Sequence, residues 1–131
     1  MKRLLALLLT ISCLGCGYSS PKAAPAAPGV VPIIMQLAPN TAKSGDSGFL
    51  LTVNGSSFAQ NAMVNFNGVA QNTGHMAANQ LTAMIPASAI ATPGTVAVTV
   101  TNPATPGMGG IYGGSGSTAA ATSAPMNFTI N

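Results

Sequence analysis

Residues 49–58 read FLLTVNGSSF and decide the fold. Phe49, Leu51 and Val53 occupy alternate positions, which is the period of a β-strand with one buried face. The Asn-Gly-Ser-Ser that follows is typical of turns, so we expect the strand to end or bulge there. Phe58 stands five positions after Val53, on the wrong side for a continuous strand. The interruption resets the alternation, and we expect Phe58 to fold back over the end of a β-sandwich.

The same period recurs along the chain between turn signals. The other segments that carry it are 33–37, 63–66, 81–85, 96–100 and 126–130. Asn67-Gly68 is the strongest hairpin signal, because both central residues of a type I′ turn need positive φ. No stretch keeps a helical period over three turns. Six or seven short strands in about 100 residues predict an all-β, two-sheet sandwich.

Five ordered segments resemble one known family. They are LAPNTAKSGDSGFLLTVNGSSF, AMVNFNGVA, NQLTAMIPASAI, GTVAVTVTNP and APMNFTI. The residues that match its pattern are Pro39, Gly55, Phe58, Gly68, Pro86, Asn102 and Pro103. Together they resemble an IPT/TIG domain, an early-set immunoglobulin-like fold. The resemblance covers about residues 32–130, and it implies one immunoglobulin-like domain over residues 32–131.

The N-terminus carries the features of a secretion signal. Lys2 and Arg3 precede a short apolar run, and the segment ends in Ser-Cys-Leu-Gly-Cys. The LGC at 14–16 resembles the lipobox of bacterial lipoproteins, in which the signal is cut before an acylated cysteine. Residues 1–15 are therefore predicted to be a lipoprotein signal peptide, with Cys16 as the lipidation site. Cys13 is the competing site, and an ordinary signal without lipid stays open as an alternative.

The chain after Cys16 contains no further cysteine, so a disulfide framework is excluded. Residues 16–31 are rich in proline and alanine and are predicted to be a linker. Pro21, Pro25 and Pro28 favour an extended chain there. This organisation predicts a cell-envelope lipoprotein, anchored in the outer membrane through its lipid and facing the periplasm or the cell surface.

Charge is scarce in this chain. The formal net charge is +3, and removing Lys2 and Arg3 with the signal lowers it by two, to +1. Only Lys22, Lys43 and Asp46 then carry charge. Binding to nucleic acid needs several cations for the phosphates, so we predict no nucleic-acid partner.

The inventory of reactive groups argues against catalysis. Asp46 is the only carboxylate side chain and His75 the only imidazole. General acid–base catalysis needs paired carboxylates, or a histidine with a nucleophile and an orienting group. One aspartate and one histidine do not fill a metal shell either. We predict a protein that is not an enzyme, with no catalytic residue, metal site or cofactor.

The stretch at 103–125 is longer than the short connection usual in the family and is rich in glycine. Ile111 and Tyr112 form an apolar pair at its centre. They are candidates for a partner contact, and the alternative is that they rest on the domain's own flank. The methionines on strand positions are expected to fill gaps in the core.

These observations predict a non-enzymatic envelope lipoprotein with one interaction module that has a protein-binding, structural or adhesive role. Recognition would run through loops at one end of the sandwich or through strand addition at an exposed edge. The partner would be an envelope protein or a polysaccharide. The alternative function is an accessory polysaccharide-binding module, for which only Tyr18 and Tyr112 could stack on a sugar.

Overall fold

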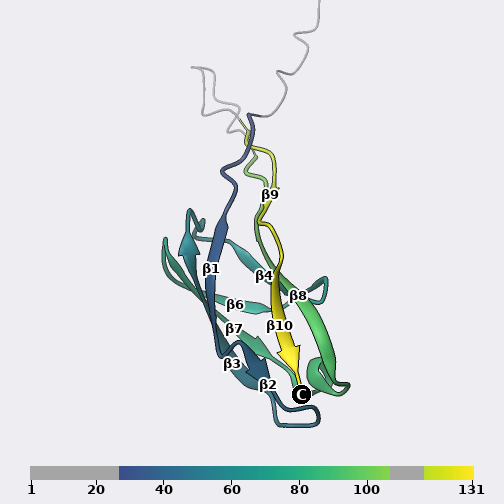
Figure 1. Cartoon of the computed structure of the whole chain (residues 1–131). Helices are drawn as coiled ribbons and strands as arrows, with labels where there is room; N and C mark the ends of the chain where they lie inside the picture. The colour runs from purple at the N-terminus through teal and green to yellow at the C-terminus, as the bar shows by residue number, and fades with distance from the viewer. Residues whose placement is uncertain (1–26, 107–116) are drawn as a thin grey trace, which may run out of the picture.

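Two β-sheets face each other across one core (Figure 1). The computed structural model describes residues 27–106 and 117–131. The first sheet has the order β1 (Ile33–Ala38), β3 (Phe49–Ser56), β7 (Gln80–Ile85) and β6 (Asn72–Ala77). The all-β immunoglobulin-like sandwich predicted from the sequence is confirmed.

The second sheet is built mainly on the longest strand, β8. Its order is β2 (Thr41–Ala42), β10 (Met126–Ile130), β8 (Gly94–Asn102), β4 (Met63–Phe66) and β5 (Val69–Ala70), and β9 (Ala121–Thr122) also pairs with β8. A single 3-10 turn, η1 (Ala87–Ile90), follows β7. All pairings are antiparallel except that of β2 with β10, which run parallel.

All six strands predicted from the sequence are present. The hairpin at Asn67-Gly68 is also confirmed, because φ is +52° at Asn67 and +77° at Gly68, and Phe66 pairs with Val69 across the turn. The sequence did not predict the two-residue strands or β6. Each two-residue strand is too short to show a period, and β6 reads NTGHMA, which has no alternating apolar residues.

The core is formed by the inward-facing residues of both sheets. Phe128 lies at its centre: its ring stacks on Phe49 with centroids 5.6 Å apart and meets Phe66 edge to face at 5.3 Å. The other fully buried large side chains come from β3, β4, β7, β8 and η1, together with Pro32 just before β1. These rings and branched side chains fill the space between the sheets, as the alternation in the sequence predicted.

The interruption in FLLTVNGSSF lies later than its turn residues indicate. β3 stays paired with β1 through Ser56, so Asn54 and Gly55 belong to the strand. The alternation is reset at Ser57, which has a φ of +61°. Phe58 is then only 4% exposed and belongs to the core cluster, as expected. The ladder irregularity that accompanies it is a bulge in the partner strand β1.

The expectation that strand methionines fill the core is wrong for most of them. Met35, Met63, Met76 and Met84 are exposed, and Met126 is half-buried. The reason is side-chain parity: Met84, for example, stands between buried Ala83 and Ile85 and therefore faces outward.

A buried asparagine at the end of β8 joins three segments. Asn102 is 6% exposed. Its Nδ2 donates to the carbonyl oxygens of Val30 and Ser57, both at 2.8 Å, and its Oδ1 accepts from the Ala59 N–H at 3.0 Å. The side chain thus fixes both the segment that enters β1 and the turn that carries Phe58.

The chain before β1 is also hydrogen-bonded to the domain. The Ala27 N–H donates to the Ser117 carbonyl at 2.9 Å, and the Ala119 N–H donates to the Ala27 carbonyl at 2.8 Å. Residues 27–31, which the sequence assigned to the linker, therefore lie against the second half of the 103–125 stretch. The predicted signal peptide, Cys13, Cys16, Ile111 and Tyr112 fall outside the described residues.

Candidate functional site

The first sheet has two edge strands, β1 and β6, and the edge of β1 borders a groove. Within the described residues, β1 has one neighbouring strand, β3, and its other edge is unpaired. It faces β10, which belongs to the other sheet. There β2 pairs only with Thr129 and Ile130, so the first residues of β10 have a strand partner on one side alone.

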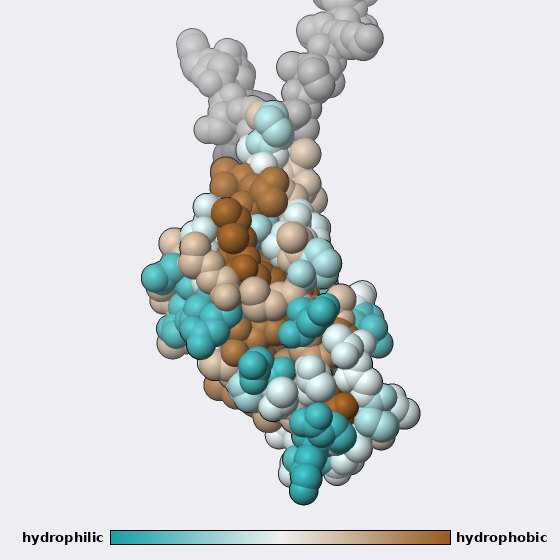
Figure 2. Space-filling model, viewed as in Figure 1, coloured by the Kyte–Doolittle hydropathy of each residue, from teal (hydrophilic) through white to brown (hydrophobic). Residues whose placement is uncertain are grey.

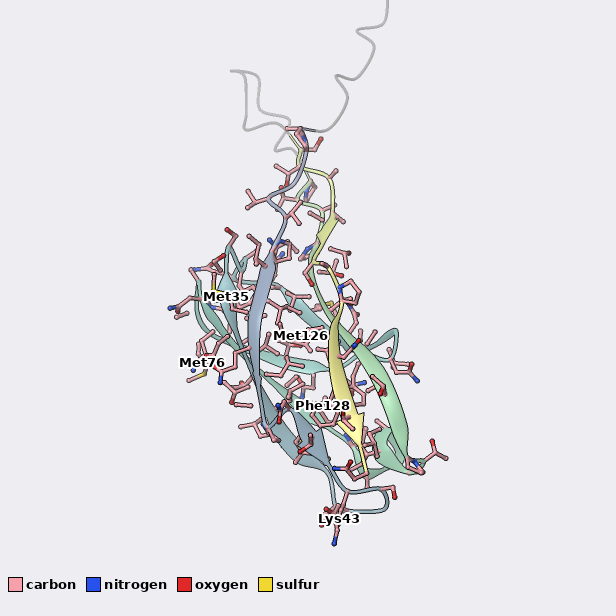
Figure 3. The ribbon with its side chains drawn as sticks, in the orientation of Figure 1. Met35, Lys43, Met76, Met126 and Phe128 are labelled. Carbon is pink, nitrogen blue, oxygen red and sulfur yellow. The ribbon has the colours of Figure 1, made fainter. Side chains whose placement is uncertain are left out.

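A groove of about 450 Å³ lies between these two strands. Its lining residues are Met35, Gln36, Leu37, Ala38, Pro39, Asn40, Met126 and Asn127. Figure 3 labels Met35 and Met126, which come from the two strands that border it. The groove exists because β1 pairs with the first sheet, after which the chain passes Pro39 and Asn40 to reach the second sheet at β2.

The groove carries no charged side chain. One wall is a continuous stretch of β1 backbone, so alternate peptide groups of β1 point away from β3. An extended segment placed there could hydrogen-bond to those groups and set its side chains beside Met35 and Met126. This arrangement is suited to binding a polypeptide strand.

A second hollow, of about 380 Å³, lies beside the β4–β5 hairpin and η1. Its lining residues are Phe66, Asn67, Val69, Gln71, Pro86, Ser88, Ala89 and Thr92. None of these side chains is charged or titratable, so it offers shape and amide groups but no acid–base chemistry.

The only carboxylate side chain and the only imidazole of the sequence lie apart. Asp46 is exposed in the loop that leads into β3, which begins opposite Ile85 of β7. His75 is half-buried on the edge strand β6, opposite Leu81. Those two points are four residue steps apart along β7, or about 13 Å at the rise of a β-strand. The described residues therefore bring no carboxylate to the imidazole.

His75 has one unusual feature. Its Nε2 atom is buried, and no hydrogen-bond partner for it lies among the residues described. No group of three or more metal-ligating side chains occurs in residues 27–106 and 117–131. The imidazole lies on the same half-buried side of β6 as Thr73.

The phenylalanines do not form a platform for a sugar ring. Phe58, Phe66 and Phe128 are buried, and Phe49 is half-buried against the core. The two tyrosines that could stack on a sugar, Tyr18 and Tyr112, are outside the described part of the chain.

The predicted lipidation and loop contacts are not placed by the structure, since Cys16, Cys13, Ile111 and Tyr112 lie outside its described ranges. On both sides of residues 107–116, Thr105 and Thr118 exchange backbone hydrogen bonds of 3.1 and 3.0 Å. Among the described residues, no helix has the length and hydropathy needed to cross a bilayer.

Sequence reasoning missed two features. The groove depends on which sheet β1 joins, and periodicity does not report this. The structural role of Asn102 was hidden as well, although its place beside Pro103 at the end of a Val-rich strand matched the family pattern.

Comparison with known proteins places these observations in a family. Residues 32–129 match the sequence model of the IPT/TIG domain. No curated protein gives a significant match to the chain. The matched range includes both sheets and both walls of the groove, and it covers more than half of the chain. The chain belongs to the IPT/TIG family, whose immunoglobulin-like sandwich it forms with β1 as an open edge.

Proposed function

We propose that this chain is a non-enzymatic cell-envelope lipoprotein whose IPT/TIG domain binds an extended segment of another envelope protein, in an adhesive or structural role. The observation that carries the proposal is the unpaired edge of β1 beside the groove. The lipid on Cys16, or alternatively on Cys13, holds the domain at the outer membrane.

The chemistry of β1 supports strand addition. Soluble proteins commonly protect edge strands with lysine, proline or inward-pointing charges. The sequence of β1 is IIMQLA, which contains none of these. An added strand would therefore meet no charge along β1, and β10 would border its other side.

The separation of Asp46 from His75 supports a binding role without catalysis. Within the part of the chain that the structure describes, neither side chain forms a hydrogen bond that would orient it for proton transfer. Uncharged grooves bordered by backbone are well suited to holding a peptide.

The anchor is tested by mass spectrometry of the mature N-terminus from membranes. We expect an acylated cysteine at position 16, and a Cys16→Ser variant that leaves the membrane fraction. An acylated Cys13 would move the site, and an unmodified N-terminus would exclude the lipoprotein.

The groove is tested with Ala38→Lys, which places a charge on its lining. We expect this variant to lose the envelope protein that co-purifies with the wild type while keeping its melting temperature. Val69→Lys is the matched control, because Val69 is exposed on β5 in the other sheet.

The proposal fails if Ala38→Lys retains the partner as well as the Val69→Lys control does. Binding of purified envelope glycans that is lost in Tyr112→Ala would favour the polysaccharide-binding alternative instead.

A further inference from the structure

Four large aliphatic side chains are exposed within six consecutive positions at one end of the domain. They are Val30 (66% exposed), Val31 (56%), Ile33 (52%) and Met35 (67%), and we call them the apolar strip. Figure 2 shows the apolar surface gathered over the start of β1 and the segment that leads into it. The strip begins near the end of the molecule where Ala27 enters and continues along β1 (Figure 1).

The strip is held on a fixed backbone. The carbonyl oxygen of Val30 accepts a hydrogen bond from the Asn102 side chain. The N–H and the carbonyl of Ala27 are hydrogen-bonded to Ser117 and Ala119. Pro32, inside the strip, is fully buried. The exposed side chains therefore stand on an ordered support, so little backbone freedom is lost when they are covered.

The charged side chains of the described domain lie at one end, and the apolar strip lies toward the other. Lys43 and Asp46 are the only charged side chains in the described residues. Both lie in the loop between β2 and β3, at the end opposite to the strip, where Figure 3 labels Lys43. Hydrogen bonds from Ser44 to Asn131 and from Gly45 to Ile90 fix that loop. Among the described residues, the strip end therefore carries no charge that a nonpolar environment would exclude.

We propose that the apolar strip rests on the lipid surface of the membrane to which the chain is anchored. This inference depends on the proposed lipidation of Cys16. Ten residues separate Cys16 from Ala27. They span at most about 40 Å when fully extended, so the strip is confined near the lipid. Confinement raises the effective concentration of the strip at the bilayer, and aliphatic side chains add binding in proportion to the area they bury there.

Strand pairing with a second copy through β1 fits the tether less well. Two β1 edges related by a two-fold axis would pair antiparallel, which turns the tethered end of one copy away from that of the other. Two copies anchored in one membrane have their tethered ends on the same side. The bilayer, by contrast, can contact the strip of every anchored copy in the same orientation.

The test uses the absence of tryptophan from the sequence. Ile33→Trp puts the only tryptophan of the chain in the strip, and Val69→Trp puts it on an exposed site of the other sheet as the control. Both full-length lipidated chains are reconstituted into vesicles of phosphatidylethanolamine and phosphatidylglycerol, with and without brominated lipid. Flotation with the vesicles reports the anchor separately.

We expect both variants to float. The emission of Ile33→Trp should shift to the blue and be quenched by brominated lipid, whereas Val69→Trp should show neither effect. Adding Val31→Asp to Ile33→Trp should remove the shift and the quenching but not the flotation. Thermal melting of each variant shows that the domain is folded.

Any of the following results would contradict the proposed contact between the strip and the membrane. If Ile33→Trp floats without shift or quenching, the strip does not touch lipid and the anchor stands. If the chains do not float, the lipoprotein assignment fails together with the docking that depends on it. A blue shift without vesicles that grows with protein concentration means that a second copy covers the strip instead.

Discussion

The ring of Phe58 packs against the α-carbon of Gly55. A Cβ atom built on Gly55 would lie 2.7 Å from Phe58 Cζ and 1.9 Å from the carbonyl oxygen of Ile33. Both distances are shorter than any real contact. The glycine in FLLTVNGSSF is therefore required by the close approach of β1 and of the phenylalanine three positions later.

Gly55→Ala should destabilise the domain, because β1 and Phe58 must both move to admit the methyl group. We expect the free energy of unfolding to fall by about 1–3 kcal/mol, the usual range for overpacking. Urea denaturation measures it. Ser56→Ala, at the next position of β3, should change it by less than about 0.5 kcal/mol. Equal stability of the two variants would contradict the packing described.

Asn102→Ala removes the three hydrogen bonds that join Val30, Ser57 and Ala59. The partner backbone groups would be left without hydrogen bonds in a partly buried environment. We therefore expect the free energy of unfolding to fall by about 2–3 kcal/mol. Thermal unfolding measures the loss. Asn127→Ala is the control, since Asn127 is exposed on β10. A change no larger than that of the control would show that Asn102 is dispensable.

Gly68→Ala tests the hairpin turn by backbone conformation alone. A Cβ at this position meets nothing within 4 Å, but φ is +77°. We expect a loss of about 1–2 kcal/mol from the left-handed conformation. Chemical denaturation measures it, and Asn67→Gly, which suits the same turn, should be close to neutral. An unchanged stability of Gly68→Ala would mean that the turn rearranges.

His75→Leu removes a buried nitrogen that has no partner among the described residues. A polar atom left unpaired inside a protein lowers stability, so replacing it with an apolar group should leave the free energy of unfolding unchanged or raise it. Calorimetry compares the melting temperatures. A marked decrease would show that Nε2 forms a bond in solution, for example to water.

The sequence predicted the strands that show a clear alternation, such as 81–85 and 96–100, because one face of each is buried. It also predicted the turn at Asn67-Gly68, since positive φ has a strong residue preference. β6 was missed because its buried side contains Thr73 and His75, which are polar. Its place is set by pairing with β7, and no local signal in the segment reports that pairing.

The candidate site was predicted less well than the fold. The sequence indicated an exposed edge but did not identify β1, because the choice of edge depends on how strands are ordered in each sheet. The methionines show the same limit. Met35 was expected in the core, but the bulge at 34–36 and its outward direction expose it.

The parallel pairing of β2 with β10 has a mechanical consequence. Ala27 and Asn131 lie at opposite ends of the molecule (Figure 1). A stretching force between them pulls β2 toward one end and β10 toward the other, along their common axis. The bonds from Thr129 to Asn40 and from Asn131 to Ala42 are then loaded at the same time, not one after another. A domain stretched between its two ends would resist extension by shear of this short ladder.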